Sequence, residues 1–361
     1  MARPRLRFEI VALAILAVYP FVPVLDWALE GLAGESPRIA RQLVNIYIFA
    51  ILGLALNVQV GYAGLLQLGI AAFFAIGAFS TGVLTVEKYP FQIGFWGALV
   101  GAPLVAGFAG LALGAPTVRL RGDYLAIVTL GFGEVVRVVI LNLESITDGP
   151  RGLNPVPRPW LPARIAPTPG GGNEDLVMYY LALALLVGLF VVFTRLEKSR
   201  TGRALVALRE DALAAAAIGL DPTRIKLFAF AAGAAVAGLA GALYASTLTT
   251  TAEPGTYDFN YSVMVLCCLI IGGLGSLRGV VIGAFVLLGF DNVVSPYLTR
   301  LLQRGGDGGS PNVFLTFTNW RWIIFGLALV LVMRFRPEGL WPSRRVRREM
   351  HVEPDSGGTG A

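Results

Sequence analysis

The sequence predicts an all-α protein, a polytopic transmembrane helix bundle with about ten spans. Two features of composition predict this fold class: 55% of the 361 residues are hydrophobic and only 14% are charged, whereas a soluble domain carries roughly 25% charged residues. The third feature is that the apolar residues form separate runs, many of about 20 residues, the length that a helix needs to cross a bilayer. The 44 glycines are typical of closely packed membrane helices.

Ten apolar runs are candidate spans. The first resembles the apolar part of a secretory signal peptide, but it is about a full span long and no clear cleavage site follows, so we expect a retained helix. The eighth and tenth runs are short and the third is rich in glycine, so the count falls to eight or nine if one run is re-entrant. The runs cover residues 8–25, 40–59, 65–86, 92–115, 123–143, 176–194, 226–247, 262–274, 279–298 and 320–334.

The basic residues predict the orientation of the bundle. Most of the 29 lie at the N-terminus, in the 195–225 loop and from Arg334 onward, beside span ends that share one side of the membrane. Positive charge of this kind is typical of the cytoplasmic side. We therefore expect both termini in the cytoplasm, with a transmembrane domain over 1–343 and a cytoplasmic tail over 344–361. The proline- and glycine-rich 144–175 loop is then external.

Missing residue types exclude several functions. The only histidine is His351, in the tail, so we expect no catalytic residues and no metal site in the membrane. None of the three lysines follows a glycine, so the phosphate-binding loop G-x-x-x-x-G-K-[ST] is absent. We expect no cofactor in this chain, and any ATP would be bound by partner subunits. The adjacent Cys267 and Cys268 are interpreted as packing residues.

Charge inside the spans is scarce. Glu134 and Arg137 lie three residues apart on one predicted helix, close enough to pair or to face a common cavity. One interpretation is a pathway or packing pair inside the bundle. The other is that both side chains lie near the outer end of the helix and reach water. The residues alone leave both open.

One charged stretch, TGRALVALREDALAAAAIGLDP (201–222), interrupts the apolar chain. It predicts a short amphipathic helix with Thr201 as its N-cap and Gly219 at its end. Such a helix lies on the membrane surface or docks into a groove on another protein, and a partner that supplies energy is the attractive candidate. The apolar residues at helical spacing are Leu205, Leu208, Ala212 and Ala215.

This region also resembles a known family. The segment EKSRTGRALVALREDALAAAAIGLDPTRIKLFAFA (197–231) resembles the cytoplasmic coupling segment of the permeases of branched-chain amino-acid ABC importers. Together the matching stretches cover most of residues 40–342 and resemble the M-type permease. The others, in the expected order, are GYAGLLQLGIAAFFAIGAF (61–79), RLRGDYLAIVTLGFGEVVRVVILNLESITDGPRGL (119–153), GGLGSLRGVVIGA (272–284) and RFRPEGLWP (334–342).

The resemblance implies a heteromeric importer in the bacterial plasma (inner) membrane. This chain and a second permease subunit would form the translocation pathway, and two ATP-binding subunits would power it. An extracytoplasmic solute-binding protein would deliver leucine, isoleucine or valine. This chain would be a transport subunit rather than an enzyme. The family also includes permeases for urea and short amides.

The resemblance also implies roles for individual positions. Members of this family often have an acidic or small polar residue where Gln67 stands and an aromatic or polar residue where Ile70 stands. Both positions therefore depart from the family pattern. Asp123, Thr147 and Gly149 match the second motif without an assigned role. The residues that would couple to the ATPase are Gly202, Arg203, Ala207, Arg209, Glu210 and Gly219. The pathway candidates are Gly61, Gly64, Gln67, Gly69, Gly77, Thr129, Glu134 and Arg137.

Three hypotheses follow. The chain is a permease of a branched-chain amino-acid importer, a related permease for urea, amides or another small solute, or an ion-coupled secondary carrier that works alone. For the first two, we expect closure of the ATPase dimer to move the 201–219 helix as a rigid lever. That motion would shift the adjoining spans, 176–194 and 226–247, between outward and inward states.

Overall fold

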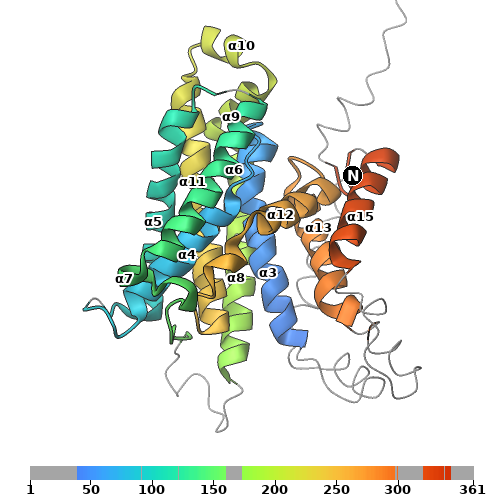
Figure 1. Cartoon of the computed structure of the whole chain (residues 1–361). Helices are drawn as coiled ribbons and strands as arrows, with labels where there is room; N and C mark the ends of the chain where they lie inside the picture. Colours follow the sequence, from blue (N-terminus) through green and yellow to red (C-terminus); the bar gives the residue numbers. More distant parts are fainter. Residues whose placement is uncertain are drawn as a thin grey trace, which may run out of the picture.

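The computed structural model describes residues 39–90, 92–120, 122–159, 173–296, 299, 320–336 and 338–342. Within these residues the chain is built from helices joined by short turns, with no β-strand (Figure 1). The expected first span and the tail lie outside the described residues. The all-α prediction is therefore confirmed for the part that the structure describes.

Each of the other nine candidate spans overlaps a helix. Six helices are long and apolar enough to cross a membrane. Three are shorter: α4 (Ile70–Thr85), α12 (Phe259–Gly272) and α15 (Arg321–Phe335). The longer ones are α3 (Ile39–Leu56) continued by the π-helix η2 (Asn57–Tyr62), α5 (Gly94–Thr117), α6 (Asp123–Asn142), α8 (Asn173–Lys198), α11 (Pro222–Leu248), and α13 (Leu277–Gly289) continued by η5 (Phe290–Val294).

The third span differs from its prediction. Helix α4 begins at Ile70, and residues 64–69 before it are not helical. Gly64 has a φ of +67°, a left-handed conformation that few side chains tolerate. The backbone therefore leaves the helix after η2 and enters a new helix at α4. Irregular backbone at membrane depth is tolerated where protein covers it, and Leu65, Gln67 and Gly69 are indeed buried.

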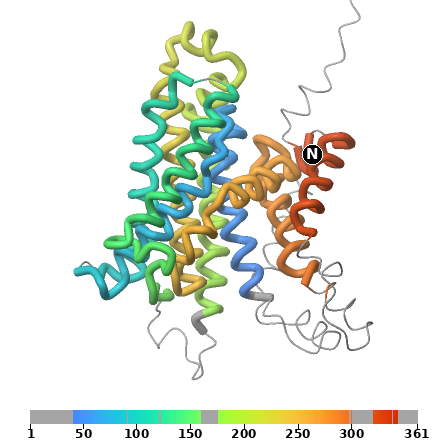
Figure 2. The backbone as a smooth tube through the Cα atoms, in the orientation of Figure 1, coloured from blue at the N-terminus to red at the C-terminus, as the bar shows by residue number. Residues whose placement is uncertain are grey.

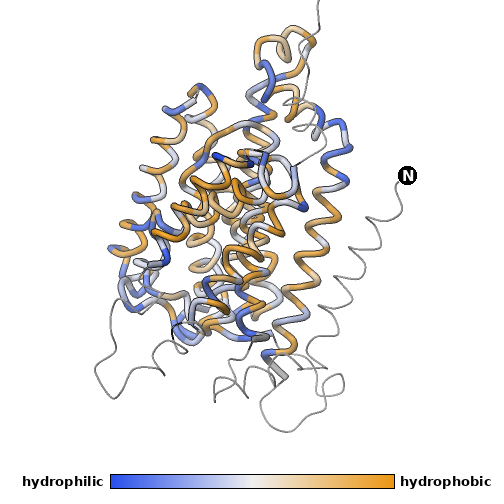
Figure 3. The backbone as a smooth tube through the Cα atoms, turned by 90° about the vertical axis from the view of Figure 1, so that its right-hand side faces the viewer, coloured by the Kyte–Doolittle hydropathy of each residue, from blue (hydrophilic) through white to orange (hydrophobic). Residues whose placement is uncertain are grey.

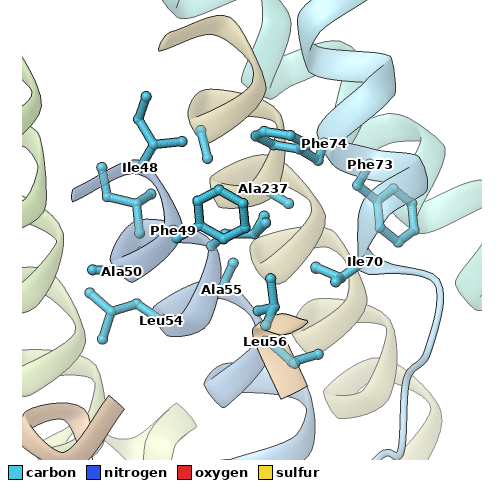
Figure 4. Packing of buried hydrophobic residues seen from close by; sticks show 14 of the residues in the cluster. Ile48, Phe49, Ala50, Leu54, Ala55, Leu56, Ile70, Phe73, Phe74 and Ala237 are labelled. Atoms are coloured by element: carbon cyan, nitrogen blue, oxygen red, sulfur yellow. The ribbon is translucent and has the colours of Figure 1, made fainter. Parts of the chain in front are cut away.

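Helix α11 lies at the centre of the larger group of helices and packs against α5, α4 and α3. Side chains from α3 and α4 meet around Ala237 of α11 (Figure 4). The small residues of α11 allow this close packing. At Gly241, for example, a Cβ atom would lie 2.1 Å from the carbonyl oxygen of Phe74, so only glycine fits.

A smaller group consists of α12, α13 and α15. Helices α13 and α15 lie on the other side of α3 from α5, and α12 crosses α3 in this view to reach them (Figure 2). The turn between α12 and α13 contains Gly273 (φ +117°) and Gly275 (φ +75°), and the Ser276 hydroxyl caps α13 by accepting the Gly279 N–H. The α12–α13 connection is therefore a tight turn between two helices. Cys267 and Cys268 are buried and free, as packing residues.

Hydrophilic residues gather toward the two ends of the bundle, whereas its middle is largely hydrophobic (Figure 3). The helices α9 (Arg200–Glu210) and α10 (Ala212–Ala217) project at one end, which we call the α10 end. The opposite end, which we call the far end, carries the short helix α7 (Glu144–Thr147). This distribution suits a bundle whose middle lies in lipid.

Candidate coupling surface and transport pathway

The coupling segment forms two helices, because Asp211 separates α9 from α10. The Asp211 carboxylate accepts the N–H groups of Leu213 and Ala214 and so caps a new helix. The prediction of one continuous helix was wrong at this point. The end at Gly219 is as expected: this glycine has a φ of +88°, and Asp221 and Pro222 then start α11.

The start of α9 also differs from its prediction. Ser199, and not Thr201, is the N-cap, since its hydroxyl accepts the Gly202 N–H at 3.1 Å. Gly202 lies so close to the end of α8 that a Cβ atom would be 2.0 Å from the Leu196 carbonyl oxygen. Gly202 therefore allows the sharp turn between α8 and α9.

The apolar face of the segment packs on its own chain. Leu205, Leu208 and Ala215 are all buried, with at most 5% of their surface exposed. Periodicity shows that a face is buried without showing by what: this face is covered by its own chain, and the docking of the helix on a partner or on the membrane stays a prediction. Two apolar residues that the periodicity did not single out are exposed instead: Leu213 of α10 is 70% exposed, and Ile218, the C-cap of α10, is 75% exposed.

The remaining predicted coupling residues take different positions. Arg203 is exposed, and its guanidinium donates to the Lys198 carbonyl oxygen at 2.8 Å. Ala207 is half-buried and Glu210 is exposed. Arg209 turns back toward the bundle, where its Nη1 donates to the Gly61 carbonyl oxygen at 2.6 Å.

Arg209 thereby connects α9 to η2 and to the segment that follows it. Its acceptor, Gly61, lies in η2, and a Cβ atom on Gly64 would lie 2.7 Å from the Arg209 Cγ. The α12–α13 turn reaches the same place, since the Gly275 N–H donates to the Asn57 side-chain oxygen at 3.0 Å. A movement of α9 would therefore act on the end of α3 as well as on α8 and α11.

The segment before α4 brings together three pathway candidates. The Thr129 hydroxyl of α6 accepts the Leu68 N–H at 3.1 Å, and a Cβ atom on Gly69 would lie 2.1 Å from the Thr129 carbonyl oxygen. Gln67 is 1% exposed, and neither polar atom of its side-chain amide has a hydrogen-bond partner among the described residues. A buried amide without partners is costly, so Gln67 is the polar group at this break that remains available to a ligand or water.

Gly77, a further pathway candidate, is a helix-packing residue. A Cβ atom there would lie 2.2 Å from the Gly238 carbonyl oxygen of α11. The second motif also contributes structure at the far end: the Thr147 hydroxyl donates to the Ile140 carbonyl oxygen at 2.6 Å, and Gly149 has a φ of +58°. Asp123 is exposed in the first turn of α6.

Glu134 and Arg137 do form an ion pair, with the Arg137 Nε 3.0 and 3.1 Å from the two carboxylate oxygens. Their side chains are 49% and 28% exposed. The pair lies in the C-terminal half of α6, five to eight residues before the helix ends at Asn142. It is not buried inside this chain's bundle, and its partial exposure favours the second interpretation over the first.

A cavity of about 240 Å³ at the far end has no counterpart in the sequence analysis. It lies between the starts of α12 and α15, and its lining includes Asp258, Tyr261, Met264, Arg321 and Trp322. The residues from α12 and those from α15 are more than 50 positions apart in the chain, so no sequence motif could reveal the cavity. Within the described residues, no group of histidine, cysteine and acidic side chains could hold a metal ion.

Together these features define a multi-pass helical membrane protein with a charged, projecting helix pair at one end. The family model of the branched-chain amino acid transport system permease component matches residues 38–333. The chain belongs to this family of transport permeases, and it is a multi-pass protein of the plasma membrane.

Several curated proteins are similar to the chain along most of its length. The high-affinity branched-chain amino acid transport system permease protein LivM of Escherichia coli is 38% identical over 358 residues, which cover 93% of this chain and 75% of the relative. The LivM protein of Salmonella typhimurium is 40% identical over 315 residues, covering 82% and 68%. A probable LivM of Methanocaldococcus jannaschii is 23% identical over 338 residues, covering 85% and 94%. No solved structure matches the chain.

Proposed function

We propose that this chain is one of two permease subunits of an ABC importer for leucine, isoleucine and valine in the bacterial inner membrane. The observation that carries the proposal is the match to the branched-chain amino acid permease family together with similarity to LivM proteins over most of the chain. The chain lacks a phosphate-binding loop, so partner ATPase subunits bind and hydrolyse ATP. A solute-binding protein delivers the amino acid.

In this proposal the bundle crosses the membrane ten times with both termini in the cytoplasm, and the α10 end is cytoplasmic. The basic residues of the 195–225 loop support this orientation. One of the ATP-binding subunits receives α10 in a groove, and Leu213 and Ile218 supply its apolar contact. Exposed apolar side chains on a water-facing helix favour a protein partner.

The proposed mechanism passes motion from the ATPase to the bundle by two routes. The first runs from α9 and α10 directly into α8 and α11, which adjoin them in the chain. The second runs through Arg209 to Gly61, and so to the break between η2 and α4. Shifts of this kind alternate a pathway between outward- and inward-facing states. Gln67 and Thr129, at that break, then border the pathway.

Uptake by a strain that lacks the gene tests the substrate class. We expect uptake of labelled leucine to be lost in this strain and restored by the intact gene, with uptake of labelled urea unchanged. Loss of urea uptake with leucine uptake intact would instead indicate a permease for urea or amides. Leucine uptake that continues after the partner ATPase loses its catalytic glutamate would indicate an ion-coupled carrier.

A further inference from the structure

The cavity at the far end has walls from two helices that lie far apart in the sequence. It lies between the starts of α12 and α15 and has a volume of about 240 Å³. Sites for drug-sized ligands measure roughly 300–1,000 Å³, so this cavity suits a smaller solute. At about 30 Å³ per water molecule it has room for about eight waters, or for one small organic molecule such as a free amino acid.

One wall of the cavity carries a fixed positive charge. Arg321, the first residue of α15, has its Nη1 3.3 Å from a carboxylate oxygen of Asp291, whose side chain is 9% exposed. The guanidinium also lies over the Trp322 ring, with its Cζ 5.0 Å from the ring centroid. A guanidinium has five N–H donors, and this ion pair uses one end of it. Arg321 is therefore held in place with donors left for a second carboxylate.

The opposite charge comes from α12. Asp258, the N-cap of this helix, is half-buried. Its Oδ1 accepts the Tyr261 N–H at 3.3 Å, and its Oδ2 accepts a hydrogen bond from the Asn260 side-chain amide. A carboxylate has about four lone-pair sites, so Asp258 can also accept hydrogen bonds from an ammonium group. Among the described residues that line it, the cavity thus presents one cation and one anion from two different helices.

Three side chains add apolar surface to the lining. Tyr261 and Met264 come from α12, and Trp322 comes from α15. Tyr261 is fixed by the core, because its ring stacks on Phe49 at 5.6 Å between centroids and its hydroxyl lies 3.3 Å from the Tyr244 hydroxyl. Met264 has a flexible, polarisable side chain that adapts to apolar groups of different shape. This surface suits aliphatic side chains that branch in different ways.

The two charges select a zwitterion. A carboxylic acid without an amine would lie beside the negative charge of Asp258 and offer it no donor. An amine without a carboxylate would lie beside the positive charge of Arg321 and offer it no acceptor. A free amino acid carries both groups at neutral pH, so it complements both walls where each of the simpler compounds leaves one charge unpaired.

We propose that this cavity binds a free amino acid with an apolar side chain. Arg321 binds its carboxylate and Asp258 binds its ammonium group. Tyr261, Met264 and Trp322 contact its side chain. The inference rests on the proposed function, in which the far end is external, so the cavity receives the solute from the binding protein before the solute enters the bundle.

Photolabelling with photo-leucine, a diazirine analogue of leucine, tests the location. The analogue is irradiated with the purified complex of this chain, the second permease and the ATP-binding subunits, without the binding protein, and adducts are mapped by mass spectrometry. We expect adducts at Met264 or Trp322 that excess leucine suppresses. Isocaproate, which lacks the ammonium group, and isopentylamine, which lacks the carboxylate, should not suppress them at the same concentration. Absence of adducts at both residues, or equal suppression by all three compounds, would overturn the assignment.

Charge variants test the two polar contacts. Asparagine keeps a helix cap and removes the charge, so Asp258→Asn should raise the Kd for leucine about tenfold, the effect of losing a hydrogen bond to a charged group. The variant should also lose its preference for leucine over isocaproate. Arg321→Lys, which keeps a charge beside Asp291 but loses the planar fork, should weaken leucine binding as well. Asp221→Asn makes the same change as Asp258→Asn at the N-cap of α11, at the α10 end, and should bind leucine as the unchanged protein does. A preference for leucine over isocaproate that survives Asp258→Asn would overturn the inference.

Labelling and binding are read without transport, so their outcome is separate from that of the proposed function. Leucine uptake by cells whose purified complex shows no label in the cavity would contradict the inference alone. A labelled cavity in a complex that supports no leucine uptake would uphold the inference and contradict the proposed function.

Discussion

At the scale of single residues, Arg209 shows how a contact inside the chain can serve a coupling segment. Its guanidinium donates to the Gly61 carbonyl oxygen, although the resemblance had placed it among residues that meet the ATPase groove. A hydrogen bond from a charged donor is worth about 1.5–3 kcal/mol, enough to keep α9 attached to η2 while both move. Arg209 is therefore proposed as a positioning residue that transmits motion.

The Arg209→Met variant tests this role. We expect leucine uptake to fall about tenfold, the effect of losing a hydrogen bond of this strength, while the ATPase still co-purifies and still hydrolyses ATP. Arg209→Lys, which keeps one charged donor, should recover part of the uptake. Arg224→Met, at a side chain that is 87% exposed, is the control and should behave as the unchanged protein. Loss of ATPase co-purification in Arg209→Met would instead show a direct contact with the partner.

Gly77 gives a second prediction at this scale, on stability. Its missing Cβ atom leaves room for the Gly238 carbonyl oxygen, which is backbone and cannot move aside cheaply. Gly77→Ala should destabilise the protein by about 1–3 kcal/mol, the cost of overpacking, measured as thermal unfolding of the purified complex in detergent. Gly188→Ala in α8, where a Cβ atom would meet nothing within 4 Å among the described residues, should be neutral. Equal stability of the two variants would contradict the packing account.

At the scale of elements, the coupling segment is a pair of helices anchored by one face. Leu205, Leu208 and Ala215 hold it to the bundle, and α10 projects with Leu213 and Ile218 exposed. The segment is therefore packed on the bundle through one face and exposed at α10, which is the arrangement that the proposed lever requires.

Replacement of both Leu213 and Ile218 by serine tests the docking of α10. We expect the amount of ATPase that co-purifies with the permease to fall, because the apolar contact in the groove is lost. The permease itself should reach the membrane normally, since both side chains are exposed in the chain. Leu104→Ser, at an equally exposed residue of α5, should leave the ATPase bound. Normal co-purification of the double variant would place the docking surface elsewhere.

The elements differ in how far the sequence predicts them. Apolar runs located the nine spans that can be compared, because hydrophobic length is what a membrane helix requires. The break at Asp211 was missed, since this aspartate sits in an alanine-rich stretch that favours one continuous helix. The late start of α4 was missed because hydropathy does not detect backbone that leaves a helix at Gly64.

The same limit applies to the candidate sites. Sequence spacing correctly paired Glu134 with Arg137, because residues three apart share a helix face. It could not show that this face points outward, nor that Leu205 and Leu208 are covered by their own chain. Both depend on tertiary packing between residues far apart in the sequence.

At the scale of the whole molecule, the bundle has one end that carries the projecting helices α9 and α10, and its helix α6 has a face with little cover among the described residues. The projecting helices suit the proposed subunit, which would receive energy from a partner ATPase at the α10 end. The family match and the similarity to LivM proteins agree with the role of a permease subunit.

Leucine uptake by proteoliposomes tests this claim most directly. The vesicles contain this chain, the second permease and the ATP-binding subunits, with the binding protein outside and ATP enclosed. We expect uptake of labelled leucine to require both ATP and the binding protein, and to stop when the catalytic glutamate of the ATPase is replaced by glutamine. Uptake that needs no ATP and follows an ion gradient would contradict the account.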